Sequence, residues 1–262
     1  MTNTPSLDLE PHGADTFVGS SPDYPWGRIY GGLVVAQALT AATSTVAPEH
    51  HVHSLHAYFI LGGVPTEPVR YEVDRIRNGR SFSTRRVVAR QSSGAILNLS
   101  ASYHRREDGP VVDGVEPPDA PGPDDVRPSQ WESGFDYRQV DPPPEAGRSL
   151  AWARYRAPLS DDPRVHACAL AFLSDANPMD SIAGRHPVTP SSPEEWGETF
   201  VSASLDHSVW FHRDVRADQW LLFDMHSSFV GGSRGIARGE VYQDGRLVAT
   251  VAQEGLLRLR TK

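Results

Sequence analysis

The 262-residue sequence contains a single cysteine, Cys168, and no long hydrophobic run. One thiol cannot form a disulfide within its own chain. The longest uninterrupted apolar run, from Ala167 to Leu173, is much shorter than the roughly 20 residues that span a membrane. The first residues also lack the basic and apolar segments of a secretion signal. These absences predict a soluble, cytoplasmic protein that does not enter a membrane.

Positive charge is also scarce, because 25 lysine and arginine residues face 33 aspartate and glutamate residues, for a formal net charge of −8. Recognition of nucleic acid normally starts from an excess of basic residues. The composition therefore argues against a nucleic-acid partner, and any phosphate-bearing ligand must be bound by a local cluster of arginines.

Prolines are concentrated near the middle of the chain, where nine of the 22 lie between Pro110 and Pro144. Proline interrupts helices and central strands, so this stretch predicts a connector. We divide the chain into an N-terminal unit (1–106), a linker (107–133) and a C-terminal unit (134–262). Similar features recur in the same order at an offset of about 150 residues, which indicates an internal duplication.

Hydrophobic periodicity predicts the elements of the two units. Apolar residues alternate with polar ones over 69–73, 95–103 and 247–259, as in half-buried strands. Helical spacing is found over 31–42 and over 163–172, and the second of these helices starts with an N-capping aspartate and a proline. Each unit therefore combines a helix with antiparallel strands, which predicts an α+β fold with a helix on the concave face of each sheet.

Two conspicuous motifs have simpler structural explanations. The segment 231–235, GGSRG, matches the G-x-S-x-G turn of serine hydrolases, but no histidine follows His226 to act as the base. We predict a hairpin turn there. Four histidines open one predicted strand without the ligand spacing of a zinc site, so we expect a surface or interface role and no metal. These residues are His50, His51, His53 and His56.

Asp175 is the first polar residue with catalytic potential. It follows the second predicted helix and precedes Asn177 and Pro178, which start another short helix. Burial and nearby backbone N–H groups can tune the pKa of a carboxylate in this position. Taken alone, the segment slightly favours a plain N-capping aspartate.

Gln253 and Ser204 are two further polar residues at unusual positions. Gln253 has the parity of the apolar residues of its strand, so its amide faces the core and needs hydrogen-bond partners. A bulge near Gly255 could also supply them. Ser204 lies close to Asp206 and His207, but neighbouring strand residues point to opposite faces and cannot form a relay.

Five segments in this order resemble the acyl-CoA thioesterase II family. The resemblance spans nearly the whole chain, and the motifs are specific in combination rather than singly. They are GRIYGGLVVAQA (27–38), HSLHAYF (53–59), RNGRSFSTRRV (77–87), LDHSVWFHR (205–213) and QEG (253–255).

The resemblance implies a double hotdog fold, in which one chain holds two repeats of a helix wrapped by an antiparallel sheet. It also implies hydrolysis of fatty acyl-CoA thioesters without a metal or organic cofactor. In that family an aspartate, a hydroxyl residue and a glutamine activate the attacking water, and these map to Asp175, Ser204 and Gln253. Serine replaces a threonine of the family here and keeps the hydroxyl. A homodimer or higher homo-oligomer is expected, because hotdog sheets usually pair edge to edge.

Substrate-binding residues follow from the same comparison. Backbone N–H groups at a helix start would polarise the thioester carbonyl, and Gly31 and Gly32 would let the backbone approach the ligand closely. The first half has no counterpart of Asp175, so a purely structural role for the two glycines stays open. Arginines on one predicted hairpin are candidates for the CoA phosphates, although a solvated strand face explains each of them equally well. The main candidates are Arg80, Arg85 and Arg86, with Arg75, Arg77 and Arg90 nearby.

Two other functions remain open at the level of the sequence. The segment 175–180, DANPMD, matches the D-x-N-P-x-H motif of hotdog enoyl-CoA hydratases and dehydratases until Asp180, which replaces the histidine of their acid/base pair. A non-catalytic acyl-CoA-binding protein would keep the same fold.

Overall fold

The computed structural model describes residues 6–129, 134–188 and 193–260 of the chain. Both halves contain helices and antiparallel strands in a similar order. The N-terminal half comprises β1 (Glu10–Pro11), β2 (Thr16–Gly19), α1 (Gly31–Ser44), β3 (His50–Phe59), β4 (Val69–Asn78), β5 (Phe82–Gln91) and β6 (Gly94–Arg105). The C-terminal half comprises β7 (Phe135–Gln139), β8 (Arg148–Tyr155), α2 (Pro163–Ser174), α3 (Pro178–Arg185), α4 (Pro193–Thr199), β9 (Phe200–Ser204), β10 (Asp206–Phe211), β11 (Leu221–Gly231), β12 (Arg234–Gln243) and β13 (Arg246–Leu259).

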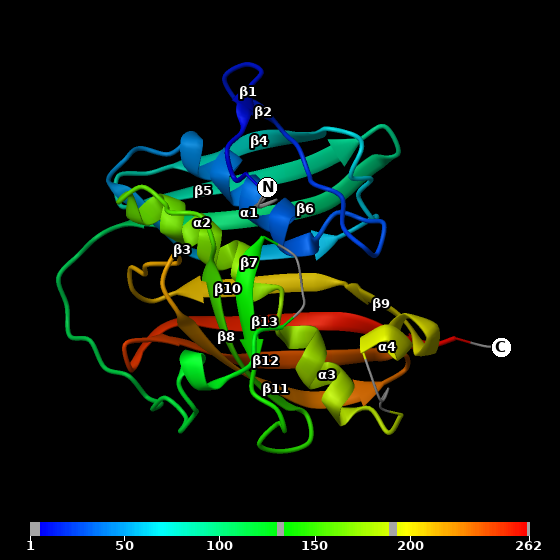
Figure 1. Cartoon of the computed structure of the whole chain (residues 1–262). Coiled ribbons are helices and arrows are strands. Elements are labelled where there is room, and N and C mark those ends of the chain that lie inside the picture. Colours follow the sequence, from blue (N-terminus) through cyan, green and yellow to red (C-terminus); the bar gives the residue numbers. More distant parts are fainter. Residues whose placement is uncertain (1–5, 130–133, 189–192, 261–262) are drawn as a thin grey trace.

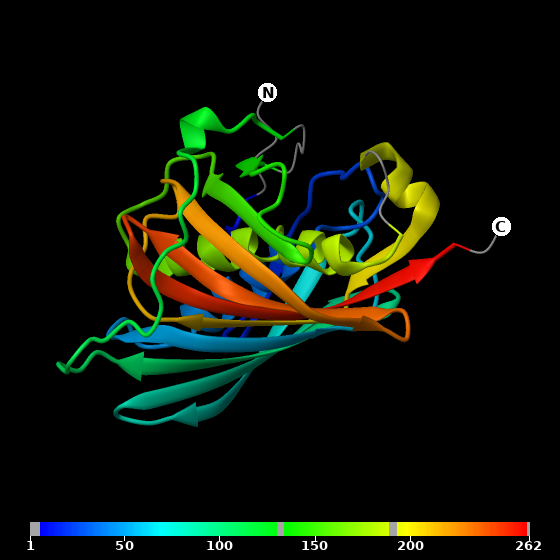
Figure 2. The same ribbon diagram turned by 90° about the horizontal axis from the view of Figure 1, so that it is seen from below.

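The thirteen strands of the described residues form one antiparallel sheet in the order β1-β2-β4-β5-β6-β3-β10-β13-β12-β11-β8-β7, with β9 also paired to β13. The two halves join where β3 pairs with β10, for example at Leu55 opposite Val209. The strands curve around the helices, and α1 and α2 lie on the concave side (Figures 1 and 2). This arrangement confirms the predicted α+β fold of two helix-on-sheet repeats.

The two central helices pack closely because their sequences are rich in small residues. Within α1, every residue from Gly32 to Leu39 is buried, and α2 is buried from Cys168 to Ser174. Alanine allows the two helix backbones to approach each other and the sheet, and it also favours the helical state. Both predicted helices are confirmed, and the Asp162 side chain accepts a hydrogen bond from the Arg164 N–H as an N-cap.

The predicted strands are confirmed, with one local difference in β13. The alternation of buried residues holds from Ala249 to Leu257. A register shift opposite Val241 and Tyr242 changes the parity at the start of the strand. Leu247 therefore packs in a small cluster with Tyr242 instead of joining the main core.

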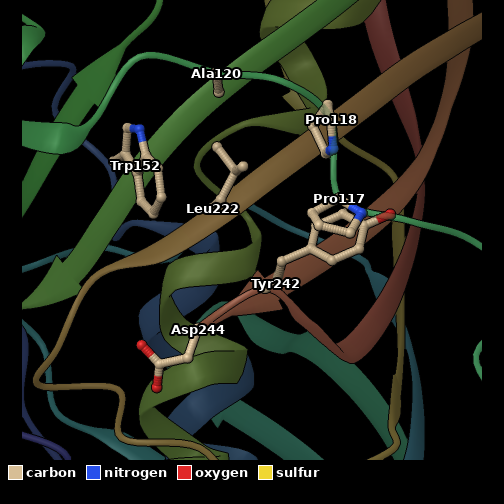
Figure 3. Close-up of a pocket in the computed structure, with 8 residues that line it drawn as sticks. Pro117, Pro118, Ala120, Trp152, Leu222, Tyr242 and Asp244 are labelled. Atoms are coloured by element: carbon tan, nitrogen blue, oxygen red, sulfur yellow. The ribbon is translucent and has the colours of Figure 1, made fainter.

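The proline-rich linker lies along the outside of the C-terminal half (Figure 1). The Trp152 indole N–H donates to the Pro121 carbonyl (2.9 Å), and the Tyr242 hydroxyl donates to the Glu116 carbonyl (3.2 Å). A cavity of about 160 Å³ lies between the linker and the sheet. It is lined by Pro117 and Pro118 of the linker and by side chains of the sheet, among them Trp152, Leu222 and Tyr242 (Figure 3). The linker thus covers apolar residues of the sheet in addition to connecting the two halves.

The GGSRG segment is a hairpin turn, as the sequence predicted, whereas the four histidines range along β3 from the buried His50 to the exposed His56. Gly232 and Ser233 form the β11–β12 hairpin turn with positive φ angles of 59° and 60°. The imidazoles of His53 and His56 form hydrogen bonds with the hydroxyls of Ser102 and Ser208. Within the described ranges, no group of histidine, cysteine or acidic residues has the geometry of a metal site, and no helix there is long and apolar enough to cross a membrane.

Candidate active site

Asp175 lies where two helices meet, directly after α2 and three residues before α3 begins. Its side chain is buried, and Oδ1 accepts a hydrogen bond from the Ser204 hydroxyl (2.9 Å). The Gln253 side-chain amide in turn donates to Ser204 Oγ (3.0 Å). The structure therefore brings together the three residues that the sequence proposed for catalysis, although they are far apart along the chain.

Burial raises the pKa of Asp175 from 3.8 to about 6, because desolvation disfavours the charged carboxylate. Hydrogen bonds from Ser204, from the backbone N–H of Gly32 and from Gln253 act in the opposite direction and lower the pKa. The carboxylate is mostly ionised at neutral pH and can still accept a proton readily, as a general base requires.

The start of α1 lies directly against this carboxylate. A Cβ on Gly31 would come within 2.8 Å of Asp175 Oδ2 and 2.9 Å of the Phe59 ring, and a Cβ on Gly32 would collide with the Phe172 carbonyl oxygen. Only glycine fits at these two positions without displacing the carboxylate or the helix. The sequence analysis predicted that both glycines lie near the ligand. In the structure, Gly31 lies beside Asp175 Oδ2, and the Gly32 N–H bonds to the Asp175 carboxylate.

Ser204 reaches Asp175 because the chain is interrupted at Leu205, between β9 and β10. The Leu205 N–H donates to the Glu254 carbonyl, and the Glu254 N–H donates to the Asp206 carboxylate. This local change between β9 and β10 alters the alternation of side chains. Ser204 consequently faces the buried site, whereas a regular strand would have turned it to the opposite face from its apolar neighbours.

His207 is a member of the buried network that sequence reasoning set aside. Its Nδ1 lies 2.6 Å from Gln253 Oε1, and its Nε2 lies 2.8 Å from the Ser174 hydroxyl oxygen. The side chain is fully buried, and burial lowers its pKa to about 4. The sequence did hold a signal, because His207 has the same parity as the apolar Val209.

A second acid, the half-buried Asp180, lies on α3 away from this hydrogen-bond chain. The Tyr137 hydroxyl donates to Asp180 Oδ2 (2.8 Å) and accepts from the Asn177 amide (2.9 Å). Burial raises the pKa of Asp180 to about 6. The residue that replaces the hydratase histidine is thus held by a tyrosine of β7.

Aromatic side chains surround the buried end of the site. The Tyr30 ring centroid lies 5.2 Å from that of Phe172 and 6.2 Å from that of Phe135. These buried rings pack against one another beside the start of α1 and keep that side of the carboxylate apolar. The cavity in Figure 3 and a second cavity of about 350 Å³ near the β11–β12 turn are lined by other residues.

Arg85 was expected to bind a CoA phosphate, and the structure corrects this interpretation. Its side chain is 1% exposed. The guanidinium donates to the side chains of Thr45 and Asn78 and to backbone carbonyls, including that of Arg77. Its donors are used to hold the β4–β5 hairpin to the end of α1, so Arg85 has a structural role.

Arg80 and Arg86 also lie away from the site. Arg80 follows β4 in a turn at the His51 end of β3, whereas Gly31 contacts Phe59 at the other end of that strand, roughly 25 Å away. Arg86 is exposed and alternates with the buried side chain that precedes it, so it points to the outer face. The sequence analysis proposed these arginines as phosphate ligands because they are close together along one hairpin, but neither lies beside Asp175.

Arg28 is a basic residue near the site that the sequence analysis did not select. The side chain is exposed and packs against Gly62, and its Nη2 donates to the Ser202 carbonyl (3.2 Å). It therefore lies between the loop that leads into α1 and the strand that carries Ser204.

Comparison with known proteins gives a consistent result. Two family models match the chain, described as the acyl-CoA thioesterase N-terminal domain over residues 20–104 and the C-terminal domain over residues 112–257. The chain is 34% identical to human acyl-coenzyme A thioesterase 8, over 98% of this chain and 89% of that protein. It is 32% identical to acyl-CoA thioesterase 2 of Haemophilus influenzae, over 92% of each.

Solved structures show the same similarity. The crystal structure of an acyl-CoA thioesterase II, TesB2, from Mycobacterium marinum has a TM-score of 0.83 and 39% sequence identity, and covers 97% of both chains. A hot dog fold protein from Alicyclobacillus acidocaldarius has a TM-score of 0.77 at 23% identity over 97% of both chains. The latter supports the fold alone.

Proposed function

Because the chain belongs to the acyl-CoA thioesterase II family, we propose that it hydrolyses acyl-CoA through a water molecule held by Asp175, Ser204 and Gln253. One observation carries this assignment of residues. A buried carboxylate with a pKa of about 6 terminates a hydrogen-bond chain that starts at the Gln253 amide and passes through the Ser204 hydroxyl.

The reaction begins when the Asp175 carboxylate accepts a proton from the bound water. The resulting hydroxide oxygen bonds to the thioester carbonyl carbon and forms a tetrahedral intermediate. The C–S bond then breaks, CoA leaves as the thiolate, and the proton on Asp175 returns to the departing sulfur. A thiolate leaves easily, so a positioned water is a sufficient nucleophile and no covalent acyl-enzyme is needed.

The helix start supplies the charge stabilisation for this step. The N–H of Leu33 donates to the Tyr30 carbonyl, and that of Gly32 interacts with Asp175. The N–H of Gly31, in the first turn of α1, is the one we assign to the thioester carbonyl oxygen. A backbone donor fixed at a helix terminus stabilises the developing oxyanion without rearrangement.

For the phosphates of CoA, we assign Arg28 in place of the three hairpin arginines. Its guanidinium is exposed, and the Ser202 carbonyl that it contacts is two residues from Ser204. It can hold a phosphate at the mouth of the site. The net charge of the chain does not oppose this, because a single well-placed arginine acts locally.

Three further expectations remain proposals. The acyl group is a fatty acid, the enzyme is cytoplasmic, and the chain forms a homodimer or higher homo-oligomer. Since β3 and β10 already join the two repeats edge to edge within one chain, any contact between copies must use another surface.

The test is release of free CoA from acyl-CoAs of increasing chain length, measured with a thiol reagent on the purified protein. Release that requires Asp175 supports the proposal. Tight binding of every acyl-CoA without release would instead indicate a binding protein, and loss of the enoyl absorbance of crotonyl-CoA would indicate a hydratase.

A further inference from the structure

His207 lies behind the proposed catalytic residues, on the side of Gln253 that faces away from Ser204. The imidazole, the Gln253 side chain and the Ser174 side chain are fully buried. Three hydrogen bonds of 2.6 to 3.0 Å connect Ser174, His207, Gln253 and Ser204 in that order. Buried polar side chains in such a chain restrict one another's orientation.

The direction of the chain follows from the charge of Asp175. An ionised carboxylate can only accept, so the single hydroxyl proton of Ser204 points to Asp175 Oδ1. Ser204 must then accept from the NH₂ group of Gln253, which turns Oε1 toward His207. His207 Nδ1 must consequently carry a proton and donate to Oε1, while Nε2 accepts from Ser174.

The protonation state of His207 is compatible with this direction. Burial lowers the pKa of His207 to about 4, so the imidazole is neutral at neutral pH and carries one proton. The Ser174 hydroxyl lies within reach of both His207 Nε2 and the Ala171 carbonyl. When it donates to Nε2, the proton of the imidazole must be on Nδ1.

We propose that His207 is a positioning residue that fixes the orientation of the Gln253 amide, and through it the direction of the hydrogen-bond chain that ends at Asp175. This inference rests on the proposed function of that site. Without the Nδ1–H donor, the amide can rotate and present Oε1 to Ser204. The Ser204 hydroxyl then donates its hydrogen bond to Gln253 Oε1 and no longer to Asp175. As a result, both the carboxylate and the attacking water lose their fixed geometry.

The experiment compares two substitutions of similar size, His207→Asn and His207→Leu. The asparagine amide N–H can occupy the position of Nδ1–H and donate to Gln253, whereas leucine cannot. We expect His207→Leu to lower kcat by about 10- to 100-fold with little change in KM, and His207→Asn to recover most of that loss. The matched control is His212→Leu, on an exposed histidine bonded to Thr250, which should keep wild-type kcat. Equal losses in both His207 variants would overturn the inference.

A double substitution separates positioning from a general structural effect. If His207 acts through Gln253, adding His207→Leu to Gln253→Ala lowers kcat by no more than about 2-fold beyond Gln253→Ala alone. The same loss in both backgrounds would show that His207 acts independently, and the proposal would be wrong.

Nitrogen-15 NMR reads the tautomer of His207 directly in the wild-type protein. The His207 signals, assigned by their absence from His207→Asn, should show a protonated Nδ1 and an unprotonated Nε2 at pH 7. The opposite tautomer would refute the proposed direction. Asp175→Asn, measured in parallel, separates a failure of the proposed site from a failure of the role of His207. If Asp175→Asn is active, the proposed site is wrong. If Asp175→Asn is inactive while His207→Leu is fully active, only the role of His207 is wrong.

Discussion

Replacing Asp175 with asparagine should inactivate the protein and at the same time stabilise its fold. The substitution keeps the size of the side chain and an oxygen that can accept from Ser204, but it removes the base that takes the proton from water. Loss of a general base typically costs about 10²- to 10⁴-fold in rate. Stabilisation is expected because the native structure buries the charge of Asp175.

The magnitude follows from the pKa of Asp175, which rises from 3.8 in the unfolded chain to about 6 in the native structure. A raised native pKa means that the group favours folding below pH 3.8 and that this contribution is lost as the pH rises through 6. The full change is about 3 kcal/mol at 25 °C. Asparagine does not titrate, so the stability of the variant relative to wild type should increase by about 2 kcal/mol between pH 4.5 and pH 8.

Urea unfolding of both proteins at several pH values measures this difference directly. Comparing the pH dependence removes any constant effect of the new amide on the hydrogen bonds of Gly32 and Ser204. Asp74→Asn, on an exposed aspartate paired with Arg86, is the matched control and should not reproduce the change. A stability difference that stays constant from pH 4.5 to pH 8 would refute the burial argument.

Three further predictions concern the neighbours of the carboxylate. Gly31→Ala places a methyl group within 2.8 Å of Asp175 Oδ2, and we expect kcat for CoA release to fall by at least about 10-fold with KM less affected. Ser204→Thr keeps the hydroxyl and should retain activity within about 5-fold, whereas Ser204→Ala should lower kcat by about 10- to 100-fold in the same assay. Arg28→Ala should raise KM for acyl-CoA by about 10-fold with kcat unchanged. Arg86→Ala, the control, should leave both constants unchanged. A raised KM in Arg86→Ala and not in Arg28→Ala would restore the hairpin arginines as phosphate ligands.

Much of the fold could be predicted from local patterns. The helices over 31–44 and 163–174 follow from their periodicity and from the cap at Asp162, and the strands follow from alternation with a period of two. The shift of Leu247 to the outer cluster could not be predicted, because it depends on a bulge in β13 opposite β12 that has no signature in either strand alone.

The site was predictable in part, for reasons that differ between residues. Asp175 and Gln253 were visible as polar residues at a helix end and on an apolar strand face, and the family resemblance connected them with Ser204. His207 was set aside because in a regular strand it would face away from Ser204, and the interruption at Leu205 that turns both to the same side is a property of pairing with β13 and not of the local sequence.

The arginine assignments failed for a similar physical reason. Spacing along the β4–β5 hairpin shows which residues are close in sequence, but it does not show which end of the sheet they occupy or which face they line. Arg85 could be identified as buried only once Thr45 and Asn78 were in contact with it. Arg28 became a candidate only when the loop before α1 was placed beside β9.

The central claim is that water attacks the thioester directly while Asp175 acts as a base. A single turnover in water enriched in oxygen-18, with enzyme in excess over acyl-CoA and mass spectrometry of both the product and the protein, tests it most directly. Direct attack predicts one labelled oxygen in the released carboxylic acid and none in Asp175. An unlabelled product together with a labelled Asp175 would show that the carboxylate itself forms an acyl intermediate, and would contradict the proposed mechanism.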